Sequence, residues 1–319
     1  MVFRPVTFDD SRMTTTKSEA SAAGPTSPST TVDRSERVPP HAYFMVSAVF
    51  HYLGPAFAVL LFARVDVLGV AWLRIASAAV VFALWRRPWR YWPPLDRATQ
   101  QLLLGWGAVL AVMNSCFYIA IDRLPLGTVA AVEFLPVIAL AALAARTRRN
   151  GLALLLAVAG VYVLTDVRLV AEPLGVAFAV ANAVLFAVYI VLGHRVAQSE
   201  RITGIDGLAL AMIIAAAVAL PIGIRGAAPA FTDAIAVVAG IGVGVSSSVV
   251  PYVCDQLAMA RLPRATYALM VSLLPATATV IGIVVLTQIP TALEVAGVVL
   301  VVAGIALHKE ASPTRSSSG

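Results

Sequence analysis

Long apolar runs recur along nearly the whole chain, and they limit the fold more than any other feature. Of the 319 residues, 60% are hydrophobic and 13% are charged. Soluble domains carry about 25% charged residues, whereas a run of about 20 apolar residues can cross the hydrocarbon core of a bilayer. The sequence therefore predicts an all-α integral membrane protein that crosses the membrane several times.

The apolar runs predict ten transmembrane helices. The joining segments are short, so consecutive helices should be antiparallel neighbours. The expected spans are residues 42–63, 67–85, 100–121, 126–145, 150–166, 173–193, 205–224, 233–259, 265–287 and 290–308. Residues 1–40 and 309–319 are rich in Ser, Thr and Pro and are predicted to be disordered tails. The first of these has no apolar core of the kind found in a signal peptide.

The positions of the basic residues predict how the chain is oriented. Lys and Arg concentrate on alternate loops, for example in "RRPWRYWPPLDR" and "RTRRN". Because cytoplasmic loops carry the excess of Lys and Arg, both termini are expected in the cytoplasm, with the protein in the plasma (inner) membrane. The net charge of +6 then needs no nucleic-acid partner. Cys116 and Cys254 both lie in apolar runs, and two thiols form neither a disulfide framework nor a metal site.

An internal repeat adds a prediction about architecture. Residues 120–136, "AIDRLPLGTVAAVEFLP", align with residues 258–274, "AMARLPRATYALMVSLL", and share Arg-Leu-Pro followed by Thr. Duplication explains this pattern better than chance matching, although chance remains an alternative. Five helices is an odd number, so residues 41–168 and 169–308 are expected to form two inverted five-helix repeats. Inverted repeats place a substrate site near the membrane midplane, where it can open to each side in turn.

Glu133 is the strongest candidate for a functional residue, because it lies within the predicted helix 126–145. A charge deep in the bilayer costs on the order of 2.5–3.5 kcal/mol on insertion scales, so its side chain should face the protein interior or water. There it could carry a proton or bind a substrate amine. A purely structural, protonated carboxyl is the alternative. Pro136 and Pro275 each remove a backbone N–H, which would free the carbonyls of Val132 and Val271 for the same polar region.

Other polar residues in predicted helices are expected along the same substrate and proton pathway. Asn114 and Tyr118 share a helix face, as do Asn182 and Tyr189. Hydrogen bonding between helices, without a transport role, is the alternative for all of them. The full set of pathway candidates is Glu133, His51, Tyr52, Asn114, Tyr118, Asn182, Tyr189 and Tyr252, with helix kinks at Pro55, Pro136, Pro251 and Pro275.

Two further charges are interpreted as structural. Arg74 is expected to extend to the outer interface or to balance a carboxylate within the bundle. Asp255 is expected to pair with Arg261 or Arg264 near the cytoplasmic side.

Three segments together resemble a known family. "RLPLGTVAAVEFLPVIALAAL", "LRIASAAVVFALWRRPWR" and "FAVYIVLGHRVA" are similar to helices 4, 2 and 6 of EamA-type members of the drug/metabolite transporter superfamily, in particular threonine/homoserine-type exporters. The resemblance covers about residues 42–308. It implies a ten-helix bundle with a central cavity that exports small metabolites, is driven by an ion gradient and needs no cofactor.

Together these features predict a secondary transporter that exports amino acids or related metabolites by alternating access, with protons as the expected coupling ion. A membrane enzyme is disfavoured because the chain has no HExxH or GxSxG motif. A scaffold or receptor-like protein remains an alternative, as does a transporter of drugs or nucleotide precursors. The expected partners are the small-molecule substrate, the coupling ion and lipid, and the sequence leaves open whether the protein forms a homodimer.

Overall fold

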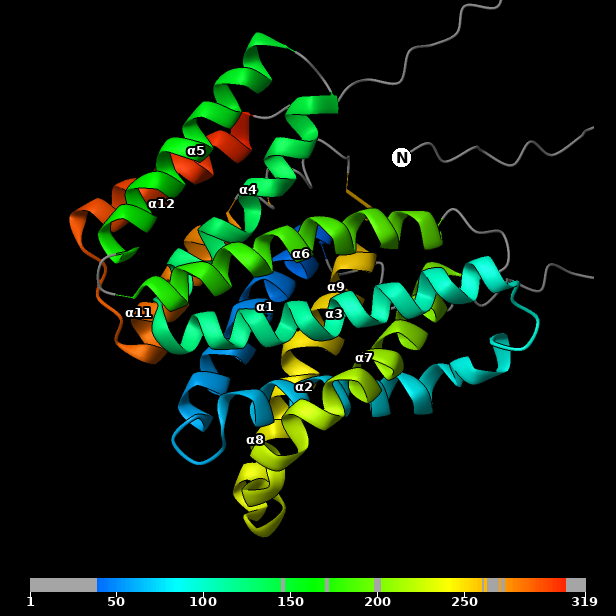
Figure 1. Ribbon diagram of the computed structural model, residues 1–319. Helices are drawn as coiled ribbons and strands as arrows, with labels where there is room; N and C mark the ends of the chain where they lie inside the picture. The colour runs from blue at the N-terminus through cyan, green and yellow to red at the C-terminus, as the bar shows by residue number, and fades with distance from the viewer. Residues whose placement is uncertain are drawn as a thin grey trace, which may run out of the picture.

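The computed structural model describes residues 39–144, 147–169, 172–197, 202–259, 261–262, 270 and 273–307. These residues form helices and no strand, and each of the ten predicted spans contains described helix. The α-helices are α1 Pro40–Leu61, α2 Val67–Arg86, α3 Arg97–Arg123, α4 Leu126–Ala144, α5 Arg148–Leu169, α6 Pro173–Ala197, α7 Gly204–Ala227, α8 Ala234–Gly244, α9 Val250–Met259, α11 Leu274–Leu286 and α12 Ala292–Leu307 (Figure 1). Two short 3₁₀ segments, Pro88–Tyr91 and Ala228–Thr232, and a π-helical segment, Val245–Val249, lie between them.

Side-chain caps fix where several helices begin. The Asp66 side chain accepts a hydrogen bond from the Leu68 N–H at the start of α2. At the start of α12, the Glu294 carboxylate accepts from the Thr291 N–H while the Thr291 hydroxyl accepts from the Glu294 N–H. This reciprocal pair is a capping box, which satisfies backbone donors that have no partner within the helix. These two helices therefore begin where polar residues interrupt the apolar runs.

Several described helices are long and apolar enough to cross a membrane. The five that meet this condition are Pro40–Leu61, Val67–Arg86, Arg97–Arg123, Pro173–Val196 and Gly204–Thr232. Four shorter apolar helices are Leu126–Pro136, Ala234–Val249, Leu274–Leu286 and Ala292–Leu307. The predicted all-helical, membrane-spanning class is thus confirmed. The span expected as one continuous helix at 233–259 differs, because α8 and α9 are joined through the π-helical segment.

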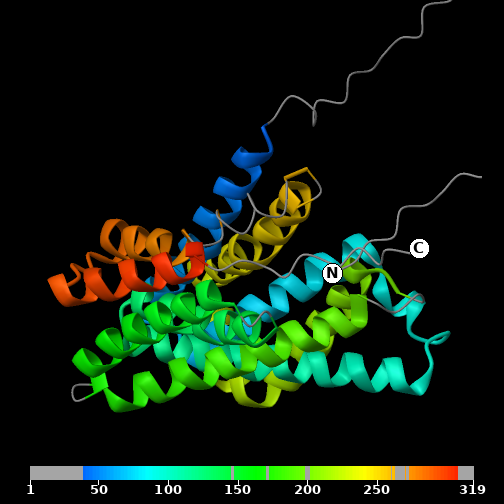
Figure 2. The ribbon, with the colours of Figure 1, turned by 90° about the horizontal axis from the view of Figure 1, so that it is seen from above.

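Helices from the two halves of the chain pack against one another throughout the bundle. The most extensive contacts join α5 with α12, α2 with α7, α3 with α6, and α3 with α7, and α1 also packs against α9. Figure 1 shows α5 and α12 side by side, and Figure 2 shows α1 beside the α8–α9 segment. Gly160 on α5 and Gly297 on α12 let these two backbones approach closely, because a side chain at either position would meet the other helix.

The buried apolar residues form two main clusters. One joins α1, α3 and α4 to parts of α5, α6, α11 and α12, and includes Tyr52, Tyr118 and Val129. The other joins α2, α3, α6 and α7, and includes Phe82 and Trp106. Both clusters contribute to the walls of an internal cavity, which is therefore surrounded by packed side chains from both halves.

Candidate functional site

A cavity of about 80 Å³ lies within the bundle and is lined by side chains from seven helical segments. About 10–15 Å³ of such volume holds one water molecule, so the space is large enough for several. Its polar lining consists of His51, Arg74, Asn114, Glu133, Asn182, Tyr189, Ser247 and Ser248, and its other lining residues are Pro55, Ile75, Leu110, Met113, Phe117, Phe186 and Met212.

Glu133 and Asn182 form one polar wall of this cavity. The Glu133 side chain on α4 is 8% exposed, and Asn182 on α6 is fully buried. The Asn182 Nδ2 group donates a hydrogen bond of 3.1 Å to Glu133 Oε1. Within the described residues, Glu133 belongs to no ion pair, and the Asn182 Oδ1 atom has no hydrogen-bond partner. This wall therefore presents a carboxyl group that is supported by a neutral amide.

Arg74 forms a second polar wall. Its Nη1 donates a 2.6 Å hydrogen bond to Asn114 Oδ1, and its Nη2 lies 3.4 Å from the Ser247 carbonyl oxygen. Its guanidinium carbon lies 5.6 Å from the centre of the Tyr118 ring, a cation–π contact. Asn114 is oriented by its own Nδ2, which donates to the Leu110 carbonyl oxygen at 2.8 Å. Contacts from α3 and the π-helical segment thus hold the Arg74 cation of α2 against the cavity.

Aromatic rings complete the lining. Phe186 and Tyr189 on α6 are stacked with their centres 6.3 Å apart, and Trp106 lies 5.4 Å from Tyr189. His51 on α1 lines the cavity, while its neighbour Tyr52 is fully buried and contacts the His51 ring edge-on at 5.1 Å. Flat apolar rings beside polar groups suit a small ligand with charged and apolar parts.

The structure brings most of the predicted pathway residues to this one cavity. His51, Pro55, Asn114, Glu133, Asn182 and Tyr189 line it directly. Tyr52 and Tyr118 are fully buried beside its lining residues, Tyr118 under the Arg74 guanidinium. The side chains of Tyr252 and Asp255, and residues Arg264 and Val271, lie outside the described residues.

Two sequence-based expectations differ from the structure. Arg74 pairs with no carboxylate among the described residues; Asn114 and Ser247 hold it at the cavity instead. Pro275 does not kink the middle of a helix: it lies in the first turn of α11, where a missing N–H removes no helical hydrogen bond. Pro55 and Pro136 do lie inside helices, while Pro251 is the second residue of α9 and its carbonyl oxygen accepts a hydrogen bond from the Ser47 hydroxyl.

Ser247 and Ser248 are cavity residues that the sequence interpretation missed. Both lie in the π-helical segment Val245–Val249, which faces α1 and α2. Such wide turns are uncommon and occur mainly at functional sites. The signal in the sequence was the run of three serines, 246–248, inside an otherwise apolar span.

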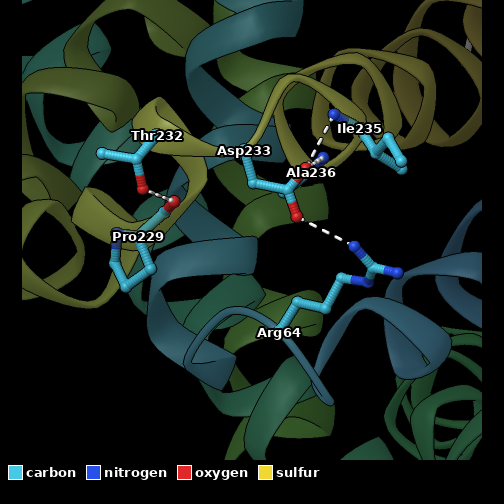
Figure 3. Close-up of polar contacts among 6 residues, drawn as sticks. All are labelled: Arg64, Pro229, Thr232, Asp233, Ile235 and Ala236. Atoms are coloured by element: carbon cyan, nitrogen blue, oxygen red, sulfur yellow. Dashed lines mark hydrogen bonds and ion pairs between the residues drawn. The ribbon is translucent and has the colours of Figure 1, made fainter.

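Three ion pairs among the described residues link the halves near helix ends, away from the cavity; the longest joins Arg123 and Glu172 at 3.9 Å. Arg86 at the end of α2 contacts Asp206 at the start of α7 through two hydrogen bonds of 2.8 and 3.1 Å, and the Asp206 side chain is only 3% exposed. Arg64, before α2, donates a 2.9 Å hydrogen bond to Asp233, which also caps α8 (Figure 3). The Arg64 guanidinium holds the pKa of Asp233 below its ordinary value.

Comparisons with known proteins show the family to which this chain belongs. The model of the EamA-like transporter family matches residues 173–308. The threonine/homoserine exporter RhtA of Escherichia coli (strain K12) is 32% identical over 247 residues, which are 76% of this chain and 81% of that protein. The chain belongs to the EamA-like transporter family.

Further matches agree with this membership. The threonine/homoserine exporter RhtA of Salmonella typhimurium (strain LT2) is 31% identical over 256 residues, covering 78% of this chain and 84% of the relative. A solved crystal structure matches with a TM-score of 0.52 and 18% sequence identity, over 85% of this chain and 98% of the other. At that identity the match concerns the fold alone. This member of the EamA-like transporter family is accordingly a membrane transporter.

Proposed function

We propose that this EamA-like transporter exports small neutral amino acids across the inner membrane by alternating access, and that a proton carried by Glu133 drives export. The observation that carries the proposal is the position of Glu133. It lies on a cavity between the halves of the bundle, and a neutral amide rather than a cation supports it. A carboxyl group without a fixed counter-charge can lose and regain a proton without breaking an ion pair.

Burial in a membrane strengthens this argument. Ionisable residues within membrane-spanning helices are rare, costly and typical of substrate and proton pathways. Glu133 is buried within α4, and the His51 imidazole lines the same cavity. An imidazole ring can accept and release a proton through its two nitrogens, so a proton relay between these two groups is part of the proposal.

The pattern of helix contacts supports an inverted repeat. If α1 to α5 correspond in order to α6, α7, the α8–α9 span, the span ending in α11, and α12, contacts should recur in matching pairs. Under this correspondence, the contact of α3 with α6 is matched by the contact of α1 with α8 and α9. The contact of α3 with α7 is matched by that of α2 with α8, and the contact of α4 with α6 by that of α1 with α11. The structure contains all of these contacts. The contacts of α5 with α12 and of α2 with α7 each join two corresponding helices, so each is its own counterpart. Such symmetry allows one bundle to adopt two mirrored states around a central site.

The amino-acid substrate is supported by the printed function of the relatives, which are threonine/homoserine exporters. It is also supported by the size and lining of the cavity, which suit a small molecule and not a large drug or a nucleotide. A transporter function needs no catalytic group and no bound cofactor.

The experiment uses the purified full-length protein in liposomes loaded with radiolabelled threonine. An imposed pH gradient should drive threonine flux through the wild-type protein. Glu133→Gln should lose flux driven by the pH gradient by at least about tenfold, because the amide cannot release a proton. Its threonine–threonine exchange, which needs no net proton movement, should fall by much less than its gradient-driven flux.

Glu294→Gln is the matched control. Glu294 is also a buried carboxyl residue, but it belongs to the cap of α12 and does not line the cavity. Its variant should keep both gradient-driven flux and exchange. If Glu133→Gln keeps wild-type gradient-driven flux, Glu133 is not the coupling group. If the wild-type protein moves no substrate from a broad panel of amino acids, the scaffold or receptor-like interpretation is favoured.

A further inference from the structure

Arg74 is a half-buried cation at the cavity whose bonding is incomplete. Its two terminal nitrogens contact an amide oxygen and a backbone carbonyl oxygen, which are both neutral. Its Nε atom is buried and has no hydrogen-bond partner among the described residues. Within the same described ranges, no carboxylate lies within ion-pair distance of this guanidinium. A guanidinium in a membrane interior normally has a partner of opposite charge.

Two arginines near the ends of α2 show the contrast. Arg64 and Arg86, which flank α2, each contact an aspartate at 2.9 Å or less. Arg74 lies between them in the sequence, within α2, and it alone of the three lines the cavity. The chain therefore supplies carboxylates to the two arginines at the helix ends and leaves the cavity arginine with neutral partners.

The cavity has a second charged group on a different wall. Glu133 and Asn182 come from α4 and α6, whereas Arg74, Asn114 and Ser247 come from α2, α3 and the π-helical segment. Glu133 and Arg74 both line the cavity without forming an ion pair with each other. The space between them therefore has Glu133 on one side, which can accept hydrogen bonds from an ammonium group. On the other side it has Arg74, which can donate hydrogen bonds to a carboxylate.

We propose that Arg74 binds the α-carboxylate of the substrate while the Glu133–Asn182 wall faces its α-ammonium group, so that the cavity selects α-amino acid zwitterions. The inference rests on the proposed function and adds its recognition chemistry. A guanidinium presents planar, paired donors that match the two oxygens of a carboxylate. Asn114 orients these donors without neutralising them, which leaves the charge for the ligand.

The test compares threonine with threonine methyl ester, which keeps the ammonium group and loses the carboxylate charge. Each competes for exchange of radiolabelled threonine in liposomes at equal pH on both sides, so proton coupling does not enter. A charge-assisted hydrogen bond predicts a preference for threonine of about tenfold or more in the wild-type protein. In Arg74→Gln, the two compounds should compete within about twofold of each other.

Asn114→Asp provides a second variant that keeps the arginine. The new carboxylate would pair with Arg74 at the position of the present 2.6 Å hydrogen bond, and threonine should lose its advantage over the ester as in Arg74→Gln. Arg64→Gln is the control, because it removes an arginine outside the cavity, and the preference should stay at the wild-type value.

The experiments distinguish failure of the carboxylate assignment from failure of the proposed proton coupling. A preference that persists in Arg74→Gln or Asn114→Asp overturns the carboxylate assignment. If neither variant can be purified, the wild-type comparison decides, and equal competition by the methyl ester overturns it. Wild-type threonine exchange without any pH-driven flux would instead contradict the coupling part of the proposed function and leave the recognition test intact.

Discussion

Four charged residues that the structure describes have two kinds of partner, according to where they lie. At the helix ends, Arg64 and Arg86 contact aspartates. At the cavity, Glu133 and Arg74 contact neutral amides. A fixed ion pair would consume the charge of both groups, whereas an amide orients a charged group and leaves it available. This difference between partners separates residues that join helices from residues that we propose to act on a substrate.

The Arg64–Asp233 contact predicts a pH dependence of stability that belongs to the exposed helix ends. The pKa of Asp233 is lowered from 3.8, first by the hydrogen bond from Arg64 and also by the N–H groups of Ile235 and Ala236 (Figure 3). A lowered pKa in the folded state gives stability that is present above the ordinary value and is lost as pH falls through the folded value.

Asp233→Asn should therefore lower the thermal unfolding temperature of the protein in detergent at pH 7. The difference from wild type should shrink as the pH is brought below about 4. Salt should also reduce the difference at pH 7, because the contact is exposed. A difference that is constant from pH 7 to pH 3 would show that the carboxylate charge does not contribute.

Residue-level prediction from the sequence succeeded for polar residues whose position in an apolar helix is costly. Glu133, Asn114, Asn182 and His51 were predicted as pathway residues, and the structure places all four at one cavity; their function remains a proposal. Arg74 was assigned a structural role because a long side chain can reach several environments. Which one it occupies depends on the partners that α3 and the π-helical segment supply, and the sequence of α2 alone does not contain that information.

At the scale of elements, α1 and the π-helical segment approach unusually closely. Gly54 lies against Ser246 and Ser247, and a Cβ atom at position 54 would overlap the Ser247 side chain. The same stretch of α1 contains Pro55, which lines the cavity. Contact between these elements is therefore connected directly to the shape of the site.

Gly54→Ala should destabilise the protein and slow exchange. Overpacking of a dense interior typically costs about 1–3 kcal/mol, so thermal unfolding should occur several degrees lower. A fluorescent maleimide that reacts with the buried Cys116 on unfolding would report the change.

Gly105→Ala is the matched control for that substitution. No atom lies within 4 Å of a Cβ built at Gly105 on α3, and alanine favours a helix over glycine by up to about 1 kcal/mol. This variant should be as stable as wild type or slightly more so. Equal behaviour of the two alanine variants would contradict the close contact between α1 and the π-helical segment.

The prediction of helices from apolar runs failed where the local backbone geometry, and not hydrophobicity, decides the structure. Apolar runs located α1 to α7 to within a few residues. They could not reveal the π-helical segment 245–249, because an apolar run is equally compatible with either helical pitch. They also placed Pro275 inside a longer helix, whereas α11 begins at Leu274.

At the scale of the whole molecule, the charge pattern predicts that the loop before α5 is cytoplasmic and that the loop between α11 and α12 faces outward. Arg148 and Ile289 are both exposed at these ends. After Cys116 and Cys254 are replaced by alanine, a membrane-impermeant thiol reagent applied to intact cells should label Ile289→Cys and should not label Arg148→Cys. Both should react after the membrane is opened. The opposite labelling pattern would reverse the proposed orientation.

The overall fold was more predictable than the site because the fold follows from hydrophobicity summed over many residues. Ten spans emerge from composition, and the all-helical class follows because the backbone must satisfy its own hydrogen bonds in lipid. The repeat, the boundary between residues 168 and 169, and the orientation remain predictions. The mutual arrangement of the halves depends on small residues such as Gly160 and Gly297, whose importance appears only once their neighbours are known.

The π-helical segment has a consequence for how this wall of the cavity can change over evolution. An oxygen of its main chain, that of Ser247, lies toward Arg74, so part of the wall does not depend on which amino acid occupies the position. Replacing a serine there would leave that oxygen in place, whereas losing one residue would rotate every following side chain of α9 by about 100°. We therefore expect the number of residues in this segment to be more constrained than its amino-acid sequence.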